Sequence, residues 1–226
     1  MIEYKIASED SIIVYFADTI SKQNVSIVQH NYALLKGLKD SGFIDLTPSY
    51  TSILIHYDIQ KYSHASVLDY LRTILTEDIE RAEEKGRLVK IPIYYDEEVG
   101  LDLKRVAESA NLTIKEVIEL HSSTIYSVYT IGFLPGFAYL GEVDAKIATP
   151  RLQTPRTKIP KGSLGIADNQ SAIYPVQSPG GWNIVGRTYL DMFDKNIEGF
   201  SYLSVGERVK FEPISRDEFI KNGGIV

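Results

Sequence analysis

The N-terminal part of the chain combines the hydrophobic patterns of strands and of helices. Segments that are apolar or alternate in polarity favour strands, and segments with apolar residues close to helical spacing favour helices. The predicted strands cover residues 4–16 (a strand with a turn), 43–46, 52–57 and 88–94, and the predicted helices cover residues 21–39 and 64–85. This order predicts a compact α/β unit of ferredoxin-like character.

Two further short helices are predicted over residues 101–110 and 113–120. The second begins with Thr113 and Glu116 in the spacing of a capping box. The pair has the length and apolar spacing of a DNA-binding helix-turn-helix, but its second helix carries one lysine against two glutamates, which would repel phosphates. We therefore expect both helices to pack on the domain that follows, and we expect no nucleic-acid partner.

From residue 122 onward the pattern is that of a β domain. Strands are short, Gly and Pro are frequent and no long helical period occurs, which favours a barrel or a sandwich. The acidic turn YDEEVG at residues 95–100 lies near the change in pattern. We expect an α+β fold, with residues 1–90 forming the α/β domain and residues 91–226 the β domain.

Composition places the chain among globular proteins. It has 226 residues, 44% of them hydrophobic and 24% charged. The absence of cysteine excludes disulfides, thiolate catalysis and cysteine metal sites. The first residues include acidic side chains where a signal peptide would have a basic flank, and no apolar run approaches the roughly 20 residues needed to span a bilayer. We expect a cytoplasmic protein without a membrane partner.

The net charge of −6 conceals a local excess of positive charge. Residues 146–187 contain six basic side chains and one acidic side chain, a balance of +5, which leaves −11 for the rest. Cations held on Pro- and Gly-rich turns fit a site for a carboxylate or phosphate, whereas a solvated basic face is the alternative. The candidate anion-binding residues are Arg151, Arg156, Lys158, Lys161 and Arg187, with Gln177, Ser178, Gly180 and Gly181 as neutral donors.

Aromatic residues and one histidine complete the set of candidates. Phe133, Pro135, Phe137 and Tyr139 form either the wall of a ligand pocket or part of the barrel core, and Trp182 either stacks on a ligand or is buried. His121, at the predicted end of a helix, is either a structural residue or an acid/base group near the anion site. No P-loop, nucleophile elbow or metal-binding motif is present, and we predict no metal ligands in the chain.

Four linked motifs carry a family resemblance. They are GFLPGFAYLG at residues 132–141, TPRLQTPR at 149–156, IPKGSLGIA at 159–167 and YPVQSPGGWNIVGRT at 174–188. Together they resemble the KipI-like, or allophanate hydrolase subunit 1, family, which includes the B-type subunit of the bacterial ATP-dependent 5-oxoprolinase. The resemblance implies a cyclophilin-like β-barrel that follows a smaller α/β domain.

The resemblance also implies a function and partners. In the enzyme of this family, a C-type subunit (KipA-like) and an A-type subunit (LamB/YcsF-like) complete the complex. The complex opens 5-oxoproline to glutamate and uses ATP as a co-substrate, together with Mg. The same family includes an inhibitor of a sensor histidine kinase, which is the first alternative. A carboxyltransferase-like module of urea or allophanate metabolism is the second. The chain contains no biotin-attachment motif, so we expect no biotin.

Overall fold

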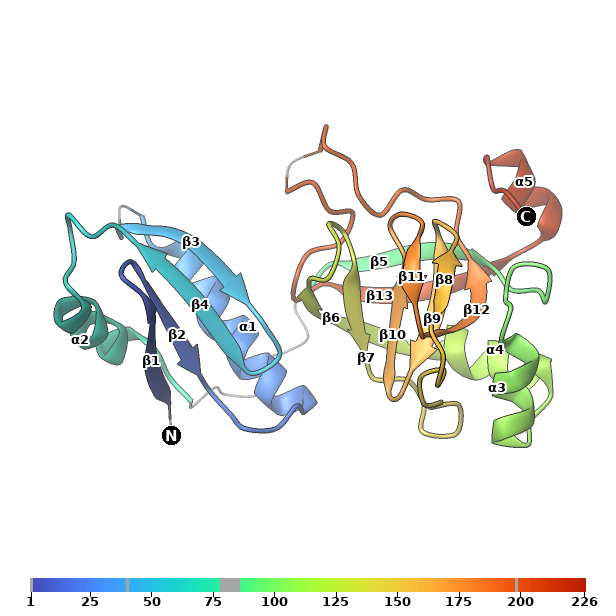
Figure 1. Cartoon of the computed structure of the whole chain (residues 1–226), viewed down its shortest axis with the longest axis horizontal. Helices are drawn as coiled ribbons and strands as arrows, with labels where there is room; N and C mark the ends of the chain where they lie inside the picture. Colours follow the sequence, from blue (N-terminus) through green and yellow to red (C-terminus); the bar gives the residue numbers. More distant parts are fainter. Residues whose placement is uncertain (1, 40, 78–85, 198) are drawn as a thin grey trace. The chain divides into compact units, whose positions relative to one another are not determined.

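The chain folds into two compact units, Met1–Lys85 and Gly86–Val226 (Figure 1). The computed structural model describes residues 2–39, 41–77, 86–197 and 199–226. The predicted boundary after residue 90 lies inside strand β5 (Leu88–Tyr94), which pairs within the second unit. The sequence pattern assigned this strand to the α/β domain, but in the structure it is part of the barrel.

The first unit is a four-stranded antiparallel sheet covered by two helices (Figure 1). The strand order is β1 (Glu3–Ser8), β2 (Ser11–Tyr15), β4 (Ser52–Tyr57) and β3 (Phe43–Pro48). Buried apolar residues alternate along β2 and β4, so both strands present one face to the core. Helices α1 (Lys22–Gly37) and α2 (His64–Ile74) bury Val28 and Val67 against that face.

Helix α2 is shorter than its sequence pattern predicts. A capping box between Ser63 and Ser66 begins it, and Leu75 follows it in an extended conformation. Leu75 is still buried, which explains why its apolar side chain extended the helical pattern. The later part of the predicted helix, residues 78–85, lies outside the described residues.

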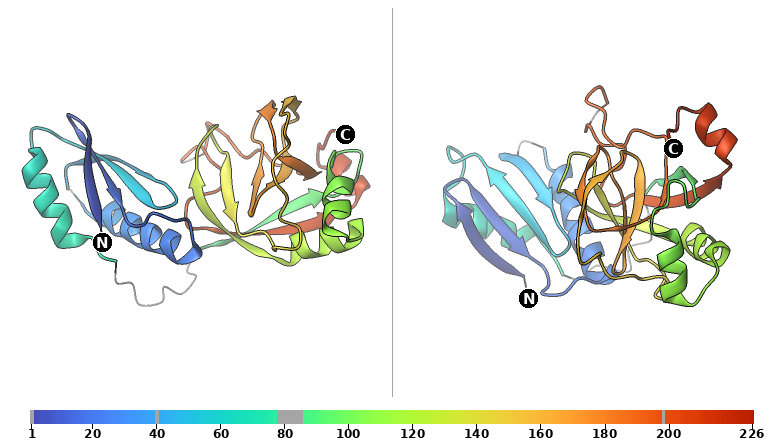
Figure 2. Two further views of the ribbon diagram at one scale, coloured as in Figure 1. Left: turned by 60° about the horizontal axis from the view of Figure 1, so that its bottom comes forward. Right: turned by 45° about the vertical axis from the view of Figure 1, so that its right-hand side comes forward.

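The second unit is a closed barrel, which confirms the predicted barrel and the α+β class (Figure 2). Its strands follow the order β10 (Gln170–Ile173), β7 (Ala138–Gly141), β6 (Ile125–Ile131), β13 (Arg208–Ile214), β5, β12 (Asn183–Arg187) and β9 (Ser163–Ala167). Only β5 and β13 run parallel among these pairs. A two-stranded sheet of β8 (Arg156–Ile159) and β11 (Ser178–Gly180) completes the unit.

Helices α3 (Leu103–Ala110) and α4 (Ile114–Ser123) lie side by side against the barrel, green in Figures 1 and 2. The predicted capping box of Thr113 and Glu116 begins α4. The short helix α5 (Arg216–Lys221) buries Phe219 against Tyr94 of β5. Within the described residues, none of the helices has the length and apolar character needed to cross a bilayer.

Candidate functional site

A cavity of about 320 Å³ opens on the barrel unit where three of the four sequence motifs meet. The β6–β7 turn, the loop before β8 and the β11–β12 turn form most of its wall. We call this cavity the aromatic pocket, and its lining residues are Phe133, Phe137, Tyr139, Arg151, Pro155, Tyr174, Pro179, Gly180, Gly181 and Trp182.

The wall of the pocket is a set of interlocked rings. Phe137 contacts Trp182 and Tyr174 edge to face, with ring centroids 5.7 and 5.2 Å apart. Phe137 and Trp182 are only 1% and 5% exposed, so the rings belong both to a core cluster and to the pocket wall. Burial raises the pKa of Tyr174 to about 12, so its phenol is neutral near pH 7. Such a buried aromatic wall suits a small ring-shaped ligand.

Phe133 stands at the mouth of the pocket in an unusual backbone conformation. Its φ is 68°, a left-handed value that is rare for an aromatic residue, and its side chain is 63% exposed. The turn needs Gly136, whose φ is 81° and whose α-carbon faces the carbonyl of Met192; a Cβ there would lie 2.4 Å from that oxygen. The tight turn thus holds an exposed ring beside Phe137, at a centroid distance of 5.4 Å.

Arg151 is the cation of the pocket. Its guanidinium lies over the Trp182 ring, 5.7 Å from the centroid. Among the described residues no carboxylate pairs with it, so its charge is available to a ligand. The backbone N–H of Leu152 donates to the carbonyl of Gly181, at 2.7 Å, and so ties the loop that carries Arg151 to the opposite wall.

The other predicted cations are not gathered in this pocket. Arg156 donates two hydrogen bonds, of 2.8 and 2.7 Å, to the buried carboxylate of Asp102. Lys161 pairs with Asp191, and Arg187 lines a separate cavity. Lys158 is exposed on β8 and does not line the pocket. The basic cluster of the sequence is therefore divided among different surroundings in the structure.

The neutral candidates are also divided. Gly180 and Gly181 line the pocket, whereas Gln177, Ser178 and Pro135 do not. A Cβ at Gly180 would lie 2.2 Å from the Tyr174 hydroxyl, so this position admits no side chain unless the wall moves. A Cβ at Gly181 would meet nothing closer than 3.5 Å.

His121 lies inside the barrel rather than in the pocket. It is fully buried, its ring is stacked on Phe211 at a centroid distance of 5.0 Å, and its two nitrogens contact the hydroxyls of Tyr95 and Ser171. Burial lowers the pKa of His121 to about 3, so the ring is neutral at physiological pH. These surroundings are those of a structural histidine, the alternative that its sequence context left open.

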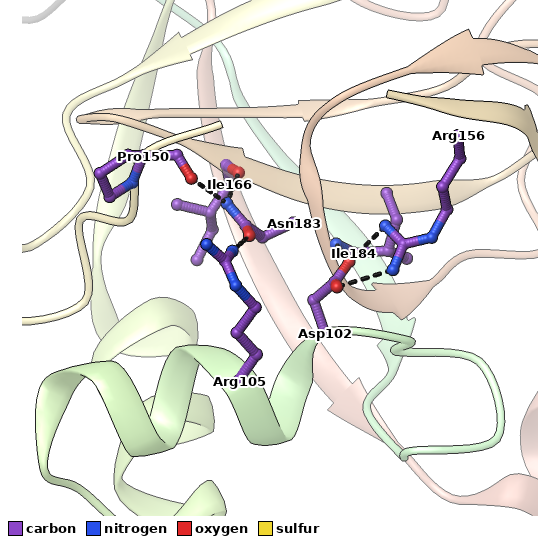
Figure 3. Close-up of polar contacts among 7 residues, drawn as sticks. All are labelled: Asp102, Arg105, Pro150, Arg156, Ile166, Asn183 and Ile184. Atoms are coloured by element: carbon purple, nitrogen blue, oxygen red, sulfur yellow. Dashed lines mark hydrogen bonds and ion pairs between the residues drawn. The ribbon is translucent and has the colours of Figure 1, made fainter. Parts of the chain in front are cut away.

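Sequence reasoning did not find two sets of polar contacts, one around Asp102 and one around Asn183 (Figure 3). Besides Arg156, the Asp102 carboxylate accepts a hydrogen bond of 2.8 Å from the backbone N–H of Ile184. The only sequence signal is that Asn183 and Arg156 lie in family-like motifs; Asp102 resembles any other acidic residue in its segment.

The contacts of Asn183 position the two segments that form the pocket. The Asn183 amide accepts from Arg105 and donates to the carbonyls of Pro150 and Ile166, both at 3.0 Å (Figure 3). Pro150 immediately precedes Arg151, and Asn183 immediately follows Trp182. Because each buried polar group has a partner, these contacts hold the loop and the tryptophan in one arrangement.

Comparisons with known proteins agree with this architecture. Residues 2–203 match the family model described as carboxyltransferase domain, subdomain C and D. The B-type subunit of 5-oxoprolinase from Bacillus subtilis is 36% identical over 221 residues, which cover 93% of this chain and 92% of the relative. The B-type subunit of 5-oxoprolinase from Haemophilus influenzae is 44% identical over 137 residues, which cover 61% of this chain and 64% of the relative.

A solved structure extends the comparison to the fold. The crystal structure of TTHA0988 superposes with a TM-score of 0.78 at 32% identity and covers 91% of this chain. The match spans only 40% of that longer chain. Together the family model and the relatives confirm the family resemblance inferred from the four motifs.

Proposed function

Since the chain belongs to the family of carboxyltransferase subdomains C and D, and its relatives include B-type subunits of 5-oxoprolinases, we propose that it is the B-type subunit of a 5-oxoprolinase. The complete reaction would convert 5-oxo-L-proline, ATP and water to L-glutamate, ADP and phosphate. Subunits of the C and A types would be its partners. The aromatic pocket, in which Arg151 has no carboxylate partner among the residues that the structure describes, is the observation that carries this proposal.

The pocket has the features that 5-oxoproline requires. This substrate is a small flat lactam ring with one carboxylate. The edges and faces of Phe137 and Trp182 suit the ring, and the Arg151 guanidinium suits the carboxylate by a charge-assisted hydrogen bond. Bound in this way, the substrate would have a fixed orientation, which lowers the entropic part of the barrier to reaction.

The remaining chemistry needs activation of the lactam. An amide carbonyl is a poor electrophile, and phosphorylation of its oxygen converts that oxygen into part of a good leaving group. The residues of the pocket fit this second reactant poorly, because Arg151 is the only cation among the described residues that line it. Within the described residues, no group of three or more His, Asp or Glu side chains gathers to hold Mg²⁺. We therefore assign nucleotide binding to one of the partner chains.

The kinase-inhibitor alternative would need outward-facing aromatic anchors. Trp182 and Phe137 instead have their rings in the pocket wall, and Phe133 is the exposed ring of this group. This arrangement favours a ligand pocket over a protein-binding surface.

The test is ATP-dependent glutamate formation by the chain together with its C-type and A-type partners. We expect activity from the assembly and none from the chain alone. Replacing Arg151 by Met should raise KM for 5-oxoproline, whereas Lys158→Met, a change at an exposed cation outside the pocket, should not. No activity in the assembly, combined with inhibition of sensor kinase autophosphorylation, would promote the inhibitor alternative.

A further inference from the structure

Tyr139 is the residue of β7 that turns away from the barrel core. Its neighbours Ala138 and Leu140 are buried in that core, whereas Tyr139 is partly exposed and lines the aromatic pocket. The difference follows from the alternation of side chains along a strand, which sends successive residues to opposite faces of the sheet. The paired strand therefore fixes the backbone from which the Tyr139 ring reaches the pocket.

Contacts with other rings hold the Tyr139 ring in place. It packs edge to face against Phe137, with ring centroids 4.9 Å apart, and its centroid lies 5.9 Å from that of Trp182. The guanidinium of Arg151 lies over the same indole, 5.7 Å from the centroid. Tyr139 and Arg151 thus share one neighbour in the pocket wall, although they come from separate segments of the chain.

The electrostatics of the pocket agree with this placement. Burial raises the pKa of the Tyr139 phenol, and the positive charge of Arg151 opposes part of that increase. Because the pKa is raised, the phenol is protonated at pH 7 and can donate a hydrogen bond. The effect of Arg151 requires its guanidinium to lie close enough to the phenol for the two charges to interact. One ligand group can therefore meet both side chains.

The other polar side chains of the pocket wall are more deeply buried. Besides Tyr139 and Arg151, the described lining residues with a hydrogen-bonding side chain are Tyr174 and Trp182, which are 1% and 5% exposed. The Tyr174 hydroxyl lies against the backbone of Gly180 and accepts a hydrogen bond from the backbone N–H of Trp182. Of the three tyrosine and tryptophan side chains, Tyr139 is therefore the one that a ligand in the pocket can best reach.

We propose that Tyr139 determines specificity together with Arg151, its hydroxyl donating to one oxygen of the substrate carboxylate while Arg151 binds the other. This inference rests on the proposed 5-oxoprolinase function and adds a specificity-determining residue to it. A carboxylate has acceptor sites for several donors, so it can bind both side chains at once. Arg151 is exposed and has many rotamers, whereas the hydroxyl of Tyr139 is carried by a ring in fixed contacts. The second donor therefore restricts the orientation of the bound carboxylate.

Calorimetric titration of the full chain with two ligands tests this assignment. 5-Oxo-L-proline carries both a lactam and a carboxylate, whereas cyclopentanecarboxylate keeps the carboxylate on a ring of the same size without the lactam. Tyr139→Phe should raise the Kd of both ligands by the same factor, roughly tenfold, because both lose one hydrogen bond to a charged group. Tyr189→Phe removes a hydroxyl outside the pocket and should change neither Kd.

Two further measurements separate a binding role from a structural one. Tyr139→Phe keeps the ring that contacts Phe137 and Trp182, so its melting temperature should equal that of the wild type. In the double variant with Arg151→Met, the increase in Kd should be smaller than the product of the two single increases. Residues that bind one group are coupled, and a structural role of Tyr139 would not produce this coupling at unchanged stability.

Three results would overturn the assignment. The first is an increase in Kd for 5-oxoproline alone, because the hydroxyl would then bind the lactam. The second is an unchanged Kd for both ligands in Tyr139→Phe, and the third is the absence of binding of either ligand to the wild type.

Turnover by the assembled enzyme judges the proposed function separately. Binding of cyclopentanecarboxylate that depends on Tyr139, without turnover of 5-oxoproline by the assembly, would reject the 5-oxoprolinase function and keep the carboxylate contact. Turnover with the same KM for 5-oxoproline in the wild type and in Tyr139→Phe would keep the function and reject the role of Tyr139.

Discussion

Two arginines close together in the sequence, one in the loop before β8 and one at the start of β8, lie in opposite surroundings. Arg156 is held by the buried carboxylate of Asp102 through two hydrogen bonds, whereas Arg151 lies on the Trp182 ring without a carboxylate partner among the described residues. Both occur in the repeated tripeptide TPR, so their sequence contexts are alike. The difference teaches that a partner, rather than residue type, separates a cation that builds the fold from one that is free to bind a ligand.

This comparison predicts the largest loss of stability at Asp102. Asp102→Asn removes the charge that compensates Arg156, and breaking a buried ion pair costs about 3–5 kcal/mol; the exposure of Arg156, whose side chain is 29% accessible, favours the lower end. Urea denaturation measures the change. The double variant Asp102→Asn/Arg156→Met should lose less stability than the sum of the losses in the two single variants, because either substitution alone already breaks the ion pair. Unchanged stability in Asp102→Asn would remove the distinction between the two arginines.

The converse is expected at Arg151, where ligand binding should suffer and stability should not. Loss of a charged hydrogen-bond partner costs about 1.5–3 kcal/mol, which raises the Kd for 5-oxoproline by roughly tenfold or more in Arg151→Met. Direct titration with 5-oxoproline gives the Kd, and thermal melting gives the stability. Lys158→Met is the matched control and should leave both unchanged. A lower melting temperature in Arg151→Met at unchanged affinity would make Arg151 a structural residue.

Two neighbouring glycines of the pocket, Gly180 and Gly181, are expected to differ in their tolerance of a side chain. Gly180→Ala places a methyl group 2.2 Å from the Tyr174 hydroxyl, and such overpacking costs about 1–3 kcal/mol. Gly181→Ala meets its nearest atom at 3.5 Å, an ordinary contact, and should cost less than about 1 kcal/mol by the same measure. Denaturation curves and 5-oxoproline affinity of both variants test this. Equal losses of stability in the two variants would show that Tyr174 can move to make room for the methyl group.

The smallest expected effect on catalysis concerns His121, which belongs with the buried framework. Its pKa of about 3 lies below the ordinary value of 6.5, so between these values the unfolded chain binds a proton that the folded chain does not. The stability contributed by the neutral ring is complete above pH 6.5 and falls as the pH decreases. The slope reaches about 1.4 kcal/mol per pH unit.

Stability measured from pH 7 to 4 for the wild type and for His121→Gln checks this slope. The variant should lack the part of the pH dependence that is due to His121. The pH dependence of catalysis by the assembled enzyme should show no titration of His121 near neutrality. An activity transition near pH 6.5 that His121→Gln abolishes would restore the acid/base interpretation.

Much of the architecture followed from local patterns in the sequence. The hydrophobic pattern predicted a strand with a turn where β1 and β2 lie, and strands at β3 and β4. The capping box of Thr113 and Glu116 predicted the start of α4, and short strands with frequent Gly and Pro predicted a barrel or a sandwich, of which the structure has the barrel. The four motifs likewise supported the family. These features depend on residues close together in the chain, so periodicity, caps and turns reveal them.

Only the tertiary structure decided the surroundings of each polar group. β5 belongs to the barrel because it pairs with β12 and β13. These partners come about a hundred residues later in the chain, so the local pattern of β5 does not reveal them. Similarly, Asp102 meets Arg156 across 54 residues, and Arg187 faces Ser163 across a strand pair. Charge and residue type determined which side chains could bind an anion. Which of them remain available depends on long-range partners, and no local pattern records those.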